Sequence, residues 1–186
     1  MENDASSAGV RLGGLYSTAE IKILICYILT TIKEPVPVTM LANVLHYEGI
    51  ANGFEVSDAV VSLQKSGHIK PTDEKEEFYT ITDKGTTISS ELNTSLSFTV
   101  KNRAYSAAIK MLSRFKNARD SEFSVSKENG ATYVTCTATD GRIPFMSIKL
   151  LVADDTQASI VKEKFIDDPA GLYHAIVDFI TKKEEN

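Results

Sequence analysis

Residues 54–67, FEVSDAVVSLQKSG, decide the predicted fold. Val56, Ala59, Val60 and Leu63 recur at helical spacing, so they share one face of a helix. The opposite face is polar and carries Glu55, Ser57, Asp58, Ser62 and Lys65. Gly67 stands where helices commonly end in a left-handed residue. The segment therefore reads as an amphipathic helix with an outward polar face, the second helix of a helix-turn-helix.

The residues upstream of this helix predict a platform for it. STAE, residues 17–20, has the pattern of a capping box and predicts a helix over 18–33. That helix is apolar on more than one side, so we expect a second cover, either the C-terminal half or a twin subunit. Pro35 and Pro37 extend the connection, Thr39 caps a helix over 39–47, and GIANG, residues 49–53, forms the turn.

A hairpin is predicted directly downstream. Residues 68–71 and 77–81 alternate in polarity around a polar tip, PTDEKE. Thr82 then caps a helix over 82–92. Three helices followed by a hairpin indicate a winged helix-turn-helix domain over residues 15–93, preceded by a flexible N-terminus over residues 1–14.

Residues 94–186 predict a small C-terminal α/β domain, so the whole chain is of the α+β class. Asn129-Gly130 predicts a hairpin between strands 122–128 and 131–139, with Val125 opposite Val134 and Phe123 opposite Cys136. A third strand, 143–153, completes a three-stranded antiparallel sheet. Its apolar face requires a three-residue turn or a bulge, with Gly141 left-handed and Pro144 at an edge or at the strand start.

Two helices close the predicted C-terminal domain. Asp155 or Thr156 caps the first, which ends near residue 166, and Asp168 precedes Pro169 at the start of the last helix, 169–182. We expect the last helix to bury five apolar residues: Leu172, Tyr173, Ile176, Val177 and Ile180.

Between the two domains, residues 92–119 contain no acid but six cations: Lys101, Arg103, Lys110, Arg114, Lys116 and Arg119. An apolar stripe of Ala104, Ala107, Ala108, Met111, Leu112 and Phe115 makes this a basic amphipathic helix. Two interpretations stay open. The cations form a solvated face that balances acids of the same chain, or they contact phosphate or a partner.

The composition, 42% hydrophobic and 24% charged, is that of an ordinary globular protein. Cys26 and Cys136 lie in apolar segments without ligand-like spacing, which predicts buried, reduced thiols. The longest nearly apolar run, residues 21–32, is too short to span a bilayer, and residues 1–14 lack the pattern of a secretion signal. We therefore expect a cytoplasmic protein with no membrane association.

Three segments carry a resemblance: residues 15–45, LYSTAEIKILICYILTTIKEPVPVTMLANVL; then FEVSDAVVSLQKSGHI; then YTITDKGTTISSEL. They resemble the winged-helix half of a domain-of-unknown-function family of Gram-positive bacteria. The later order of basic helix, three strands and two helices, closed by FIDDPAGLYHAIVDFI, is similar to the C-terminal half of that family. The resemblance implies a transcription regulator that binds DNA as a homodimer, without catalytic residues.

The predicted DNA-binding residues lie on the outward helix and the hairpin: Ser57, Asp58, Ser62, Gln64, Lys65, Lys70 and Lys75. Further phosphate or partner contacts are assigned to Lys84, Lys101, Arg103, Lys110 and Arg114. Residues 1–93, which contain the predicted DNA-binding helix, carry 7 Lys or Arg and 13 Asp or Glu, whereas residues 94–186 carry 13 Lys or Arg and 12 Asp or Glu. The acidic charge of the first half argues against strong sequence-independent binding to DNA. The alternative hypothesis is a winged-helix assembly module that binds proteins and no DNA.

No motif for catalysis or for a cofactor is present. Neither a glycine-rich phosphate loop nor a nucleophile elbow occurs, and His46, His68 and His174 have no zinc-ligand spacing. The pairs Asp154-Asp155 and Asp167-Asp168 stand at helix starts, which favours capping over acid–base chemistry. Tyr105, Tyr133 and Phe145 fit core packing or a small-molecule pocket. We therefore expect a non-enzymatic protein without metal or cofactor, and leave its effector open.

Overall fold

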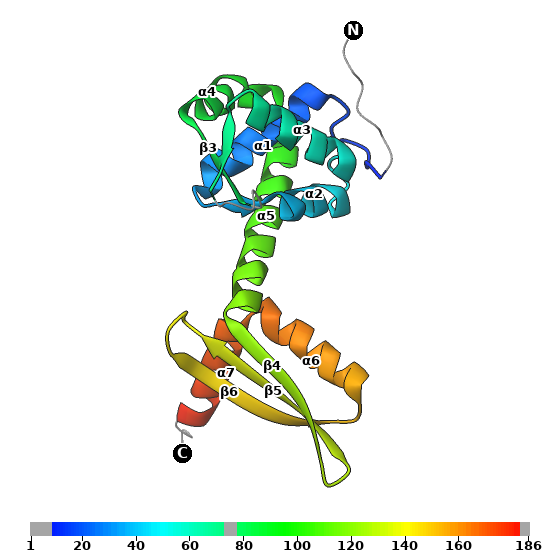
Figure 1. Cartoon of the computed structure of the whole chain (residues 1–186), viewed down its shortest axis with the longest axis vertical. Coiled ribbons are helices and arrows are strands. Elements are labelled where there is room, and N and C mark those ends of the chain that lie inside the picture. Colours follow the sequence, from blue (N-terminus) through cyan, green and yellow to red (C-terminus); the bar gives the residue numbers. More distant parts are fainter. Residues whose placement is uncertain (1–8, 73–77, 183–186) are drawn as a thin grey trace. The chain divides into compact units, whose positions relative to one another are not determined.

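The computed structural model describes residues 9–72 and 78–182. These residues form a mixed α+β structure with seven α-helices, a short 3-10 helix and two three-stranded antiparallel sheets (Figure 1). The chain divides into two compact units after Leu112. Each unit is described by itself below.

The division falls within helix α5 (Phe98–Arg119), later than the boundary predicted between residues 93 and 94. Val100, Ala104, Ala108 and Leu112 of α5 are buried in the core of the first unit. The early turns of the basic helix therefore belong to the N-terminal core. They also supply the second cover that the apolar helix 18–33 was expected to need.

The elements of the first unit are α1 (Thr18–Ile32), β1 (Val36–Pro37), α2 (Val38–Tyr47), α3 (Gly53–Lys65), β2 (Ile69–Pro71), β3 (Phe78–Ile81), α4 (Asp83–Leu92) and η1 (Asn93–Ser95). The predicted hairpin is confirmed as the antiparallel pair β2–β3, while most of its predicted tip, residues 73–77, lies outside the described residues. β1 was not predicted. It pairs with β3 through Val36 and Pro37, which gives the sheet order β1-β3-β2.

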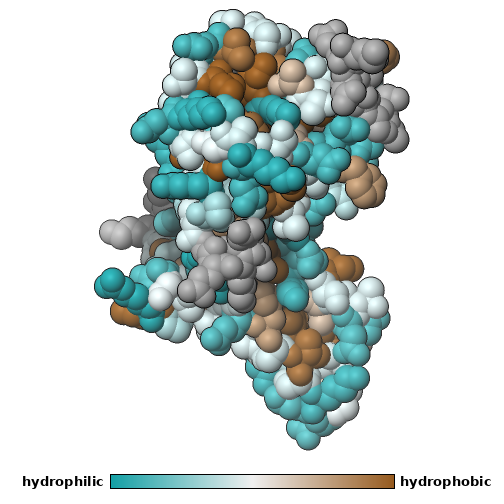
Figure 2. Space-filling model, turned by 45° about the horizontal axis from the view of Figure 1, so that its top comes forward, coloured by the Kyte–Doolittle hydropathy of each residue, from teal (hydrophilic) through white to brown (hydrophobic). Residues whose placement is uncertain are grey.

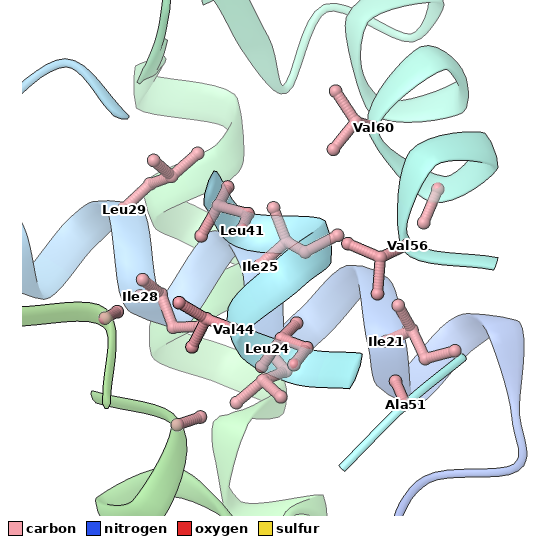
Figure 3. Packing of buried hydrophobic residues seen from close by; sticks show 14 of the residues in the cluster. Ile21, Leu24, Ile25, Ile28, Leu29, Leu41, Val44, Ala51, Val56 and Val60 are labelled. Atoms are coloured by element: carbon pink, nitrogen blue, oxygen red, sulfur yellow. The ribbon is translucent and has the colours of Figure 1, made fainter. Parts of the chain in front are cut away.

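The core of the first unit is built around α1. Ile21, Leu24, Ile25, Ile28 and Leu29 are all buried. Figure 3 shows these side chains facing Leu41 and Val44 of α2 and Val56 and Val60 of α3. The predicted inner face of α3 is confirmed, since all four of its apolar residues are buried.

Two predicted helix caps in this unit are wrong. Ser17 precedes α1, but its side chain makes no cap hydrogen bond, so the STAE segment does not form the expected capping box. Pro37 rather than Thr39 stands before α2, which starts at Val38 because the chain there is held in β1. The cap on α4 is confirmed: Thr82 Oγ1 accepts from the Gly85 N–H at 3.3 Å.

Residues 9–14 fall in the segment predicted to be flexible, yet they lie against the turn before α3. The Arg11 N–H donates to Gly49 O at 2.8 Å, and the Leu15 N–H donates to Ile50 O at 2.7 Å. Backbone pairing of this kind has no signature in the side chains of residues 9–14, which explains why the sequence did not reveal it. The rest of that predicted segment lies outside the described residues.

The second unit contains β4 (Ser121–Glu128), β5 (Ala131–Thr139), β6 (Pro144–Val152), α6 (Asp155–Asp167) and α7 (Pro169–Thr181). The hairpin register is as predicted, with Val125 opposite Val134 and Phe123 opposite Cys136. Asn129 and Gly130 both have positive φ, 52° and 81°. A two-residue turn of this kind matches the right-handed twist of the strands it joins.

The β5–β6 connection also follows the prediction. The register shifts between Ala138 and Thr139, and Gly141 is left-handed with φ 88°. The irregularity brings Met146 and Ile148 onto the same face as Val134 and Cys136. Pro144 opens β6, an edge strand, where its missing N–H breaks no ladder hydrogen bond.

Helices α6 and α7 lie along one face of this sheet (Figure 1). Asp154, rather than Asp155 or Thr156, caps α6, since its side chain accepts from the Gln157 N–H at 2.8 Å. Asp168 caps α7 as predicted. The predicted burial of α7 is wrong: Tyr173 and Ile180 are exposed, while Leu172, Ile176 and Val177 are only partly buried.

Candidate nucleic-acid interface

Helix α3 is anchored at its start and along one side. The buried Asn52 side chain accepts from the Phe54 N–H at 2.9 Å, which fixes the first turn. Val56, Ala59, Val60 and Leu63 hold the inner side in the core. The other side of α3 is open within this unit, and a shallow depression runs along it, lined by Asp58, Val61, Ser62, Lys65 and Ser66.

Four of the predicted reading residues lie on this open side. Asp58 and Lys65 are exposed, whereas Ser57 and Ser62 are half-buried. The Ser57 hydroxyl donates to Gly53 O at 3.0 Å, so its oxygen remains available as an acceptor. Both a cation and hydroxyl groups are therefore presented to the outside, together with one carboxylate.

Gln64 takes a different position from the one predicted. Its amide oxygen accepts from the Tyr79 hydroxyl of β3 at 3.0 Å, and the side chain is half-buried. Gln64 therefore connects α3 to the hairpin. The sequence could not show this contact, because Tyr79 lies fifteen residues further along the chain.

The lysines of the hairpin and of α4 differ in their surroundings. Lys70 is exposed on β2, and Lys75 lies outside the described residues. The Lys84 ammonium of α4 donates to Ser66 O, at the end of α3, at 2.9 Å. This places a positive charge at the helix C-terminus, where it interacts favourably with the helix dipole.

His68 marks a cluster of positive charge beside the end of α3. Its Nδ1 shares a hydrogen bond of 2.7 Å with the Ser66 hydroxyl. Burial lowers the pKa of His68, and the nearby charges of Lys84 and Lys22 lower it further. Lys22 was not among the predicted site residues. It is a single cation in the apolar segment of α1, and only the fold brings it near β2.

In the first unit, the predicted cations of α5 are largely occupied by intramolecular contacts. Arg103 donates to Glu48 O and lies 3.8 Å from the Glu48 carboxylate. The Lys101 ammonium lies 5.6 Å from the centre of the Tyr27 ring. Lys110 is exposed.

Arg114 belongs to the second unit and pairs there with two acids of α6, Glu163 and Asp167. Like Arg103, it satisfies its charge within the chain. Of the two interpretations of the basic helix, these contacts favour the one in which its cations balance acids of the same protein.

The second unit holds a groove of about 350 Å³ between the sheet and α6, lined by Phe123, Ser124, Val125, Val134, Asp155, Ala158, Ser159 and Lys162. Tyr105, Tyr133 and Phe145 do not line it. Tyr133 lies beneath the Lys149 ammonium, 4.7 Å from the ring centre, and Phe145 packs edge-on against Tyr173 at 5.6 Å. These two aromatic residues therefore serve packing.

The acidic pairs and the two cysteines singled out in the sequence cap helices or lie buried in the fold. Asp154 and Asp168 accept hydrogen bonds at helix starts. Cys26 and Cys136 are free and buried, as predicted; burial raises the pKa of Cys26 to about 11 and also raises the pKa of Cys136. Among residues 9–72 and 78–182, no group of three or more His, Cys, Asp or Glu side chains could hold a metal ion.

One family model matches most of the chain. The model of a family described as "Domain of unknown function (DUF4364)" matches residues 21–180, which include both units. The chain belongs to the DUF4364 family. No curated protein and no solved structure matches this DUF4364 chain significantly. In the described part of the DUF4364 chain, no helix combines the length and apolar character needed to cross a membrane.

Proposed function

We propose that this DUF4364 protein is a non-enzymatic, DNA-binding transcription regulator and that residues 15–93 form a winged helix-turn-helix. The element order α1-β1-α2-α3-β2-β3 and the sheet order β1-β3-β2 support this proposal. The observation that carries it is the position of α3, whose apolar side is buried while its polar side is open beside the hairpin. A regulator of chromosomal genes would act in the cytoplasm.

The chemistry of the open side fits the major groove. Lysine and hydroxyl side chains pair with base edges and phosphates, and an apolar group can contact the thymine methyl. Lys65, Ser57 and Ser62 supply the polar groups, and Val61 supplies the apolar contact. Asp58 accepts hydrogen bonds, which suits the exocyclic amine of cytosine.

The positioning contacts come from the cluster around His68. Lys22 and Lys84 beside His68 provide charge that phosphate can use, as does the exposed Lys70 of β2. Lys75, predicted from the sequence to contact DNA, lies outside the described residues. Arg103 and Arg114 have no part in this proposal because acids of the same chain pair with them. Since the net charge of the chain is −5, we expect weak unspecific binding, and because only a few lysines are offered to phosphate, we expect a shallow dependence on salt.

The direct test is fluorescence anisotropy with duplexes from the upstream region of the protein's own gene, at low and at physiological salt. Lys65→Ala should weaken binding about 5- to 150-fold if Lys65 contacts a base, or lower the salt slope by about 1 if it contacts phosphate. Lys162→Ala, on α6 of the second unit, is the matched control and should change neither the affinity for DNA nor the salt slope. Absence of binding at low salt would refute the proposal.

The alternative function is a protein-binding module, and one observation favours it. Phe54 and Val61, on α3, are 85% and 47% exposed, and exposed aromatic side chains are typical anchors of protein interfaces. A photo-crosslinking amino acid at position 54 would distinguish the two. A defined protein crosslinked from position 54, but not from position 160, together with no DNA binding at low salt, would establish the module.

A further inference from the structure

Apolar groups lie among polar ones on the surface that Figure 2 shows, and one exposed apolar residue of the second unit has an unusual position. Val125 of β4 stands opposite Val134 of β5, so both side chains lie on the side of the sheet that faces the core. Val134 is 1% exposed, whereas Val125 is 52% exposed. The helices therefore leave part of this side uncovered, and the groove of about 350 Å³ between the sheet and α6 lies there.

Two contacts show how β4 and α6 run along the groove. The Lys162 ammonium of α6 lies 5.4 Å from the centre of the Phe123 ring, and the Lys127 ammonium lies 3.7 Å from the Asp155 carboxylate. Strand and helix are therefore antiparallel here, and Val125 lies between the two contacts. From Asp155 to Lys162 the helix rises by about 10 Å, which gives the length of the groove.

The middle of the groove is apolar and its two ends are charged. Val125, Val134 and Ala158 line the middle. At one end, the Asp155 carboxylate already has a lysine as its counter-ion. At the other end, Lys162 takes part in none of the ion pairs found within residues 9–72 and 78–182. The groove therefore offers one uncompensated positive charge beside an apolar floor.

We propose that this groove binds a small carboxylic acid with an apolar chain, of the size of a medium-chain fatty acid. The carboxylate pairs with Lys162, and the chain lies over Val125 and Val134. Charge complementarity selects this class of ligand, because a cationic ligand would be repelled and a neutral one would leave Lys162 without a counter-ion. The volume is at the small end of the range of about 300–1,000 Å³ that is usual for ligand pockets.

This inference does not depend on DNA binding, because every residue that lines the groove belongs to the second unit. Titration of the full-length protein with octanoate, followed by heteronuclear NMR, tests it. Octanoate should shift the backbone resonances of Val125, Val134 and Ala158 in a saturable manner. Octanol and octylammonium have the same chain without the negative charge and should bind at least about fivefold more weakly. No saturable shift at the groove, or equal affinity for octylammonium, would overturn the inference.

Replacing the cation tests the role of the charge. Lys162→Met keeps an apolar stem and should raise the Kd for octanoate at least about fivefold. Lys164→Met is the matched control, since Lys164 is an exposed lysine of α6 that lies 3.7 Å from Asp167 and does not line the groove. Its affinity for octanoate should equal that of the wild type. A Lys162→Met protein that binds octanoate as tightly as the wild type would also overturn the inference.

Filling the groove tests the location. Val125→Trp should abolish octanoate binding, whereas Leu151→Trp should not, because Leu151 is a 66% exposed residue of β6 that lies opposite Tyr133 on the other side of the sheet. Both positions are exposed, so both proteins should keep the circular-dichroism spectrum of the wild type. Unchanged binding in Val125→Trp would contradict the assigned site. Octanoate binding in a protein that binds no DNA would uphold this inference and refute only the proposed function.

Discussion

At the scale of single residues, the clearest agreement between sequence and structure is at helix starts with an Asp acceptor. Asp168 precedes Pro169, and its carboxylate accepts from the Gly171 N–H at 2.8 Å. Proline at the first helical position has a φ suited to the helix and needs no hydrogen-bond partner for its nitrogen. Such signals are local, so they can be read from a few neighbouring letters.

Replacing Asp168 by Ala should lower the free energy of unfolding by about 1 kcal/mol, because the first turn of α7 loses its side-chain acceptor. Asp168→Asn keeps an acceptor of similar reach and should retain most of the stability. Chemical denaturation followed by circular dichroism measures both. Equal losses in the two variants would show that the carboxylate charge, rather than the cap, stabilises the helix.

At the scale of one element, α3 illustrates how a helix divides its two sides. Leu63 is buried against the core, whereas Val61, two residues earlier, lies on the open side. The inner side was readable from the spacing of its apolar residues. The sequence was less informative about which polar residues face outward. Gln64 was predicted to contact DNA, but its amide oxygen accepts a hydrogen bond from Tyr79 of β3.

Leu63→Ala should destabilise the protein by about 2–5 kcal/mol, since it removes buried methyl groups and leaves a cavity. Val61→Ala, a truncation of an exposed side chain on the same helix, should change stability by less than about 0.5 kcal/mol. Thermal denaturation of the two variants under identical conditions gives the comparison. A large loss for Val61→Ala would mean that the open side of α3 is covered in solution.

At the scale of the whole molecule, residues 9–72 and 78–182 form two separate hydrophobic clusters. The larger one gathers α1, α2, α3 and the early turns of α5, and the smaller one gathers the sheet β4-β5-β6 with α6 and α7. Phe165 is central to the smaller cluster, where it is buried and meets Phe123 edge-on at 5.7 Å. Separate cores should respond separately to mutation.

Phe165→Ala should cost the second unit about 3–5 kcal/mol and leave the first unit nearly unaffected. Hydrogen exchange measured by mass spectrometry resolves the two, because peptides from β5 should exchange faster while peptides from α1 keep their protection. Uniform loss of protection across both units would show that they unfold as one cooperative body.

The sequence by itself determined the features whose cause is local. Apolar spacing determined the inner face of α3, and Asn129-Gly130 determined the register of β4 against β5. The β5–β6 irregularity at Gly141 was also readable, since the apolar face of β6 would otherwise point to the wrong side. In each case the signal lies within a few residues of its effect.

Only the tertiary structure decided which distant groups meet. β1 is two residues long, too short for any periodicity, and exists because Val36 pairs with Tyr79. Arg103 and Arg114 looked available for phosphate until the fold placed Glu48, Glu163 and Asp167 beside them. Ile180 is exposed because the side of α7 that packs on the second core is the one with Leu172 and Ile176. Spacing along the chain fixes which side chains share a face, whereas the partner of that face depends on contacts between segments far apart in sequence.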